Sequence, residues 1–103
     1  MAIQTIELTA DLKNLCLKWK ISTLAIFGSF SKDLQTINSD IDLLVTFSSE
    51  AQISLLDHVR MKRDFEAYFD RKVDIISQSA LVRMKNDARK KDITDHLKVI
   101  YAA

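Results

Sequence analysis

The amino-acid sequence predicts an α/β (α+β) fold, in which a small mixed sheet has helices packed against it. Three short apolar runs, 21–27, 41–47 and 72–76, are rich in β-branched and aliphatic residues, as is typical of buried strands. The segments around them carry apolar residues at helical spacing. Both kinds of element along one chain favour a sheet covered by helices.

The first half of the chain is expected to contain one helix and two strands. Thr9 suits a helix N-cap, and residues 10–20 form the helix because Leu12, Leu15, Cys16 and Trp19 recur on one of its faces. The strand over 21–27 stops at Gly28, and the polar residues 29–39 are expected to form a turn. The second strand is 41–47, which is the clearest of the three.

The second half is expected to contain two helices and one strand. Ser54 and Asp57 resemble a capping box, which opens a helix running to about Phe69. The strand over 72–76 follows, and a basic helix is expected from Ala80 to near Ile100. The predicted order is therefore helix, strand, strand, helix, strand, helix.

Size and composition fit one small domain over residues 1–103. The chain is 48% hydrophobic, which is enough for a core. No apolar run approaches the roughly 18 residues that a membrane-spanning helix needs, so no membrane partner is expected. The single cysteine cannot form an internal disulfide, which fits a cytoplasmic location.

Charge gives little support for a nucleic-acid partner. The net charge is +1, and the basic excess lies mainly in residues 83–91. That stretch can be read as a solvated helix face or as a binding patch, and the solvated face is the preferred interpretation. Oligomeric state is left open, and a homo-oligomer remains one of the alternatives.

Two carboxylates at the start of the second strand give the strongest chemical signal. Asp40 and Asp42 alternate with apolar residues, so they project from the same face, about 6–7 Å apart along the strand. Like charges so placed repel each other unless a cation lies between them. Magnesium fits because it takes oxygen ligands from one or two carboxylates and from substrate phosphates.

A third carboxylate, Asp74, lies in the strand expected to neighbour the first two. Three acids converging from adjacent strands match a two-metal site, in which two ions clamp the attacking and leaving oxygens. The alternative is structural, with Asp40 capping a turn and Asp42 at a wet strand edge.

The turn before these acids suggests phosphate binding. Gly28 ends an apolar strand and Ser29 follows it, where a short helix could begin. A glycine lets the backbone approach a ligand closely, and N–H groups at a helix start bind phosphate. The combined pattern is rarer than either motif alone: a strand, Gly-Ser, ten residues, Asp-x-Asp and a second strand.

These residues resemble the signature of the polymerase-beta-type nucleotidyltransferases. The match runs over Ile26-Phe27-Gly28-Ser29 and Asp40-Ile41-Asp42-Leu43-Leu44-Val45. The short chain further resembles the minimal nucleotidyltransferases (MNT proteins), many of which are antitoxins that accompany HEPN-domain toxins.

The resemblance implies a fold, a reaction and a set of site residues. The fold would be a polymerase-beta-like nucleotidyltransferase core. Gly28, Ser29 and Lys32 would bind ATP, while Asp40, Asp42 and Asp74 would hold two Mg²⁺ ions and be catalytic. AMP would pass to an acceptor hydroxyl, and the antitoxins of this family modify a tyrosine of their HEPN toxin.

One departure from the family pattern leaves a second function open. Members often read Gly-Ser-x-Ala-Arg-Gly after the strand, whereas this chain has Lys32 and Asp33 at the last two positions. Lysine keeps the positive charge without the bidentate fork, and aspartate adds a negative charge near the expected phosphates. The alternative is therefore a weakly active or inactive antitoxin that neutralises its toxin by binding.

Overall fold

The computed structural model describes residues 8–27, 41–95 and 97–103. The elements follow one another in the order α1 (Ala10–Lys18), β1 (Ile21–Phe27), β2 (Ile41–Phe47), α2 (Leu55–Phe69), β3 (Val73–Ser77), α3 (Gln78–Val82), α4 (Asp87–Asp95) and β4 (Lys98–Ala102). The predicted α/β class, a mixed sheet with helices packed against it, is confirmed.

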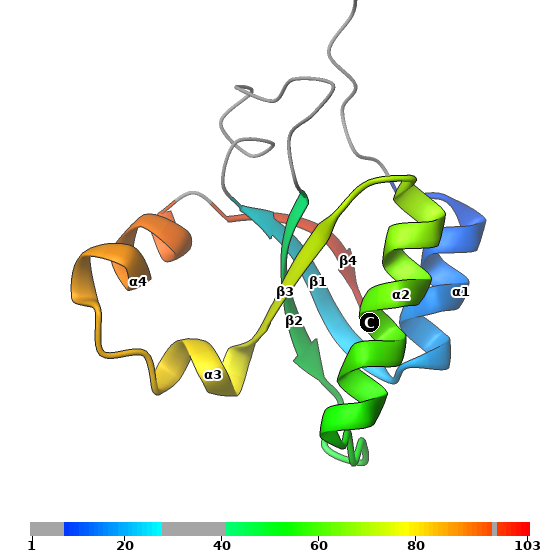
Figure 1. Ribbon diagram of the computed structural model, residues 1–103, viewed down its shortest axis with the longest axis horizontal. Helices are drawn as coiled ribbons and strands as arrows, with labels where there is room; N and C mark the ends of the chain where they lie inside the picture. Colours follow the sequence, from blue (N-terminus) through cyan, green and yellow to red (C-terminus); the bar gives the residue numbers. More distant parts are fainter. Residues whose placement is uncertain (1–7, 28–40, 96) are drawn as a thin grey trace, which may run out of the picture.

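The strands form a four-stranded sheet in the order β3-β2-β1-β4. β1 pairs antiparallel with both β2 and β4, whereas β2 and β3 are parallel. A parallel pair needs a crossover connection, and α2 supplies it between β2 and β3. α1 and α2 cover one face of the sheet, while α3 and α4 lie on the other (Figure 1).

Strand alternation divides the core between these two faces. On the α1/α2 face, Ile41, Leu43 and Val45 of β2 pack with residues such as Met61 and Phe65 of α2. On the α3/α4 face, a smaller cluster contains Ala25, Phe27, Leu44, Leu81 and Ile93. Ile41, Leu43 and Val45 therefore share one face of β2, and Leu44 belongs to the other.

The first two predicted helices begin at the caps that the sequence indicated. The Thr9 hydroxyl accepts a hydrogen bond of 3.1 Å from the Leu12 N–H at the start of α1. Ser54 and Asp57 form the expected capping box at the start of α2. Among the helices of the described ranges, none has the length and apolar character to cross a bilayer.

The single helix predicted from Ala80 to near Ile100 is wrong. The chain forms two short helices there, and Asn86 begins the second by accepting a hydrogen bond of 3.1 Å from the Arg89 N–H. Residues 98–102 then form β4, which occupies the otherwise unpaired edge of β1 and buries Tyr101. Pairing with a distant strand, which local spacing does not encode, overrides the helical pattern.

Within the described ranges, two non-glycine residues take up the left-handed backbone conformation at helix ends. Lys20, just after α1, has φ 55°, and Asp70, at the C-cap of α2, has φ 54°. Glycine is the usual residue in this position because it has no Cβ to clash with the backbone. The chain's one glycine is Gly28, so lysine and aspartate occupy these two turns.

Candidate active site

Asp42 and Asp74 are the two predicted acids within the described residues, and the sheet brings them side by side. Asp42 on β2 is in register with Asp74 on the parallel strand β3. Parallel neighbours lie about 4.8 Å apart, and residues in register point to the same face. The prediction that Asp74 lies in a strand next to that of Asp42 is therefore confirmed.

Both side chains belong to the α3/α4 face of the sheet. Each is two residues before an apolar residue of that face, Leu44 after Asp42 and Ile76 after Asp74. Asp42 is half-buried and Asp74 is exposed. The pair therefore lies at the edge of the smaller apolar cluster, with the Asp74 side chain accessible to solvent.

Phe27 is a neighbour of this pair that the sequence indicated only as part of the first strand and of the family signature. It is the last residue of β1 and lies opposite Asp42 in the antiparallel pairing. It is 5% exposed and forms part of the smaller cluster. An aromatic ring beside a carboxylate lowers the local polarity, which strengthens the attraction between that carboxylate and a cation.

The remaining predicted site residues, Gly28, Ser29, Lys32 and Asp40, lie outside the described residues. The described residues that flank this segment are Phe27 and Ile41. Ile41 begins β2, where its N–H donates a hydrogen bond of 3.0 Å to the Lys72 carbonyl. The roles predicted for the four residues of the segment remain predictions.

The chemistry of the Asp42/Asp74 pair fits a divalent cation. Two carboxylates in register repel each other, and Mg²⁺ accepts one or two carboxylates while keeping positions for phosphate oxygens and water. Within the described ranges no third His, Cys, Asp or Glu joins the pair to make a larger ligand group. The third ligand predicted from the sequence, Asp40, belongs to the segment outside those ranges.

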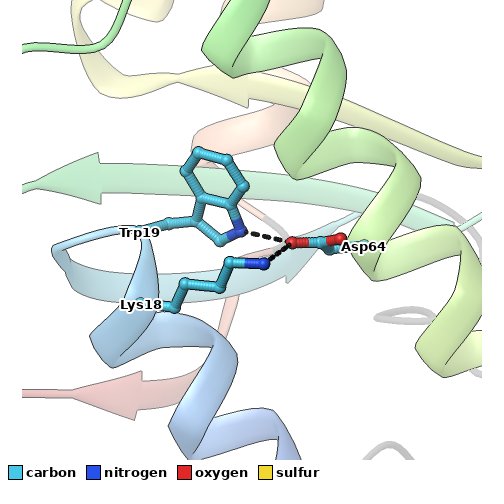
Figure 2. A network of polar contacts seen from close by, with 3 residues as sticks. All are labelled: Lys18, Trp19 and Asp64. Carbon is cyan, nitrogen blue, oxygen red and sulfur yellow. Dashed lines mark hydrogen bonds and ion pairs between the residues drawn. The ribbon is translucent and has the colours of Figure 1, made fainter.

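A separate polar network joins α1 to α2 on the opposite face of the sheet (Figure 2). One oxygen of Asp64 accepts a hydrogen bond of 2.7 Å from Lys18 and one of 2.9 Å from the Trp19 indole N–H. The bond from Lys18 contributes most to lowering the pKa of Asp64, against the opposing effect of partial burial. Asp64 is therefore a charged structural link between two helices.

Cys16 is a core residue of α1 rather than part of a reactive site. Its side chain is fully buried in the larger apolar cluster. Burial raises the pKa of the thiol to about 11. A thiol that stays protonated at neutral pH is a poor nucleophile.

Comparison with known proteins gives a consistent family assignment. A family model described as a nucleotidyltransferase domain matches residues 12–100. Protein adenylyltransferase MntA of Thermococcus cleftensis is 33% identical over 86 residues, which cover 79% of this chain and 85% of that protein.

Solved structures of toxin–antitoxin complexes share the fold. One, a toxin–antitoxin with AMP-PNP, superposes with a TM-score of 0.69 at 19% identity and covers 90% of this chain and 72% of its own. Another contains a tri-AMPylated HEPN toxin of Shewanella oneidensis with an MNT antitoxin, at a TM-score of 0.61 and 16% identity, with coverage of 89% and 67%. With the family match over most of its length, the chain belongs to the nucleotidyltransferase family.

Proposed function

We propose that this chain is a single-domain, magnesium-dependent protein adenylyltransferase that transfers AMP from ATP to a hydroxyl of a HEPN-domain partner. The observation that carries the proposal is the in-register pair of Asp42 and Asp74 on the α3/α4 face of the sheet. Family membership supports nucleotidyl transfer, and the adenylyltransferase named among its relatives supports AMP as the transferred group.

The acceptor is proposed from the proteins that this chain resembles. The solved complex of an MNT antitoxin holds an AMPylated HEPN toxin, which makes a toxin of that class the best candidate for this chain's partner. A tyrosine hydroxyl is the specific acceptor that we propose. A folded partner brings its own surface, so a domain of 103 residues need not build a complete acceptor pocket.

In the proposed reaction the acceptor oxygen forms a bond to the α-phosphorus of ATP. The bond from that phosphorus to the oxygen bridging to the β-phosphate breaks, pyrophosphate leaves, and the acceptor proton passes to solvent. Catalysis of phosphoryl and nucleotidyl transfer rests mainly on positioning and on neutralising charge. Bound Mg²⁺ would supply that neutralisation at the phosphate oxygens.

The chain's own residues have distinct parts in this proposal. Asp42 and Asp74 would hold the metal, together with Asp40, and the rigid pairing of β2 with β3 would keep their spacing fixed. Phe27 would limit water on the β1 side of Asp42. Gly28, Ser29 and Lys32 would bind the triphosphate, a role inferred from their motif and from its position directly after β1.

The experiment that tests this function uses the full chain, ATP, Mg²⁺ and a HEPN-domain partner. Intact-mass spectrometry of the partner should reveal a gain of one or more AMP units, and chelation of Mg²⁺ with EDTA should abolish the gain. Tyrosine-to-phenylalanine variants of the partner then test which hydroxyl accepts AMP.

A stable complex without any gain of AMP would contradict the proposed activity. It would favour the binding-only antitoxin that Asp33, at a position where the family often has glycine, leaves open. Calorimetric titration of the isolated chain with ATP separates the two cases further, because an active enzyme must bind ATP in a magnesium-dependent manner.

A further inference from the structure

A second candidate surface lies on the α1/α2 side of the sheet, away from the acid pair. A cavity of about 360 Å³ opens there between the end of α1 and the middle of α2. Five side chains line it: Lys18, Trp19, Arg60, Arg63 and Asp64. Three of the five are cationic and one is anionic, so the cavity attracts negative charge.

The one anion of the cavity is already engaged. Asp64 accepts hydrogen bonds from both Lys18 and Trp19 (Figure 2). Arg60 and Arg63 are exposed, and neither forms an ion pair with another residue of the described ranges. Two guanidinium groups therefore remain available to an incoming carboxylate, for which their planar fork is well suited.

Exposed apolar side chains continue this surface toward the start of α2. Leu55 is 84% exposed, Leu56 57% and Val59 41%. Leu56, Arg60 and Arg63 are spaced i, i+4 and i+7, so they share the helix face opposite buried Met61 and Phe65. We call the set of Leu55, Leu56, Val59, Arg60 and Arg63 the α2 outer surface.

This combination is typical of a surface that binds another protein. Arginine and aromatic residues are enriched at protein interfaces, and adjoining exposed apolar residues mark interaction sites. Nucleic acid suits the surface less well. Lys18 lies over the Trp19 ring at 5.2 Å, which takes up an indole face that a base would need for stacking. Leucine and valine side chains have neither a charge nor a hydrogen-bond donor with which to bind phosphates.

We infer that the α2 outer surface binds an acidic, leucine-bearing segment of a partner protein. Carboxylates of that segment pair with Arg60 and Arg63, one of them inside the cavity, while its apolar side chains cover Leu55, Leu56 and Val59. The inference deepens the proposed function and rests on it for the partner's class. The acceptor protein is anchored on one face of the domain, apart from the acids on the other.

Fluorescence anisotropy with the full chain tests this inference directly. The probe is a fluorescein-labelled peptide with leucines at helical spacing and glutamates between them. The wild type should bind it, and Arg60→Glu/Arg63→Glu should weaken binding about tenfold or more, since each lost pair becomes a repulsion. Leu56→Ala should weaken binding to a smaller extent. Lys13→Glu, an exposed charge change on α1 outside the cavity, should leave it unchanged.

Three results would overturn the inference. They are no binding of the peptide to the wild type, equal binding by Arg60→Glu/Arg63→Glu, and tighter binding of a single-stranded RNA than of the peptide. Failure here is separable from failure of the proposed function. Magnesium-dependent ATP binding should persist in Arg60→Glu/Arg63→Glu, whereas Asp42→Asn should lose it and still bind the peptide.

Discussion

Asp42 lies in register with Asp74 on the neighbouring parallel strand, and both carboxylates belong to the same face of the sheet. Strand pairing therefore fixes the spacing of the two backbone positions that carry these like charges. Repulsion between the two carboxylates lowers stability in the absence of a cation, whereas the same pair can bind a cation when one is present.

This repulsion predicts that Asp74→Asn stabilises the metal-free protein. Like charges directly opposite on neighbouring strands are destabilising, so removal of one should raise the free energy of unfolding by about 0.2–1 kcal/mol in EDTA at low salt. Urea unfolding measures this, with Asp11→Asn on α1 as the control for loss of an acid. A decrease for Asp74→Asn, or a larger gain for Asp11→Asn, would show that the pair is not under repulsion.

A second prediction concerns the turn after α1. Lys20 has φ 55°, which a residue with a Cβ adopts only at a cost, so Lys20→Gly should raise the free energy of unfolding by about 0.5–1 kcal/mol. Lys13→Gly, the same change inside α1, should lower it by about 1 kcal/mol. If Lys20→Gly also destabilises the protein in urea unfolding, the left-handed turn carries no strain.

A third prediction follows from the buried thiol of Cys16. Burial raises its pKa from an ordinary value of 9.0 to about 11 in the folded protein, so at intermediate pH the folded state keeps a proton that the unfolded state loses. The contribution of the thiol to the free energy of unfolding is fully present below the pKa of the unfolded state, and it is lost as pH rises toward 11. Between about pH 8 and about pH 10, this group should cost roughly 1 kcal/mol of stability.

The effect of Cys16 ionisation on stability is measured as the difference between the wild type and Cys16→Ala. Urea unfolding of the wild type and of Cys16→Ala over the same pH range cancels the titration of lysines and tyrosines common to both. The free energy of the wild type should fall more steeply above pH 9. Parallel curves would mean that the thiol ionises equally in both states.

The elements with local sequence signals could be predicted from the sequence alone. The runs of β-branched and aliphatic residues predicted the bounds of β1 and β2, and side-chain capping at Thr9 and Ser54 predicted where α1 and α2 begin. The alternation of Asp42 with Ile41 and Leu43 predicted that the acid and the apolar side chains belong to opposite faces. These signals act within a few residues, which is why they can be read from the chain.

Features that depend on pairing between distant residues have no local sequence signal. β4 is a strand because β1 has a free edge, and the local helical spacing around Ile100 gave the opposite prediction. The α1/α2 cavity needs Lys18 and Asp64, which are 46 residues apart, to meet across two helices. The one available signal was the pair of arginines in α2, Arg60 and Arg63. Two arginines on a helix do not by themselves indicate where a partner would bind.

The central claim is that Asp42 and Asp74 carry the transfer of AMP. It is tested most directly by the rate of AMP transfer to a HEPN-domain partner, compared among the wild type, Asp42→Asn, Asp74→Asn and Asp11→Asn. Loss of a group that only supports a metal ligand costs about 10–100-fold, so loss of either ligand itself should cost at least about 100-fold. Asp11→Asn should keep the wild-type rate, and circular dichroism should confirm that all four proteins are folded. A folded Asp42→Asn that transfers AMP at the wild-type rate would contradict the claim.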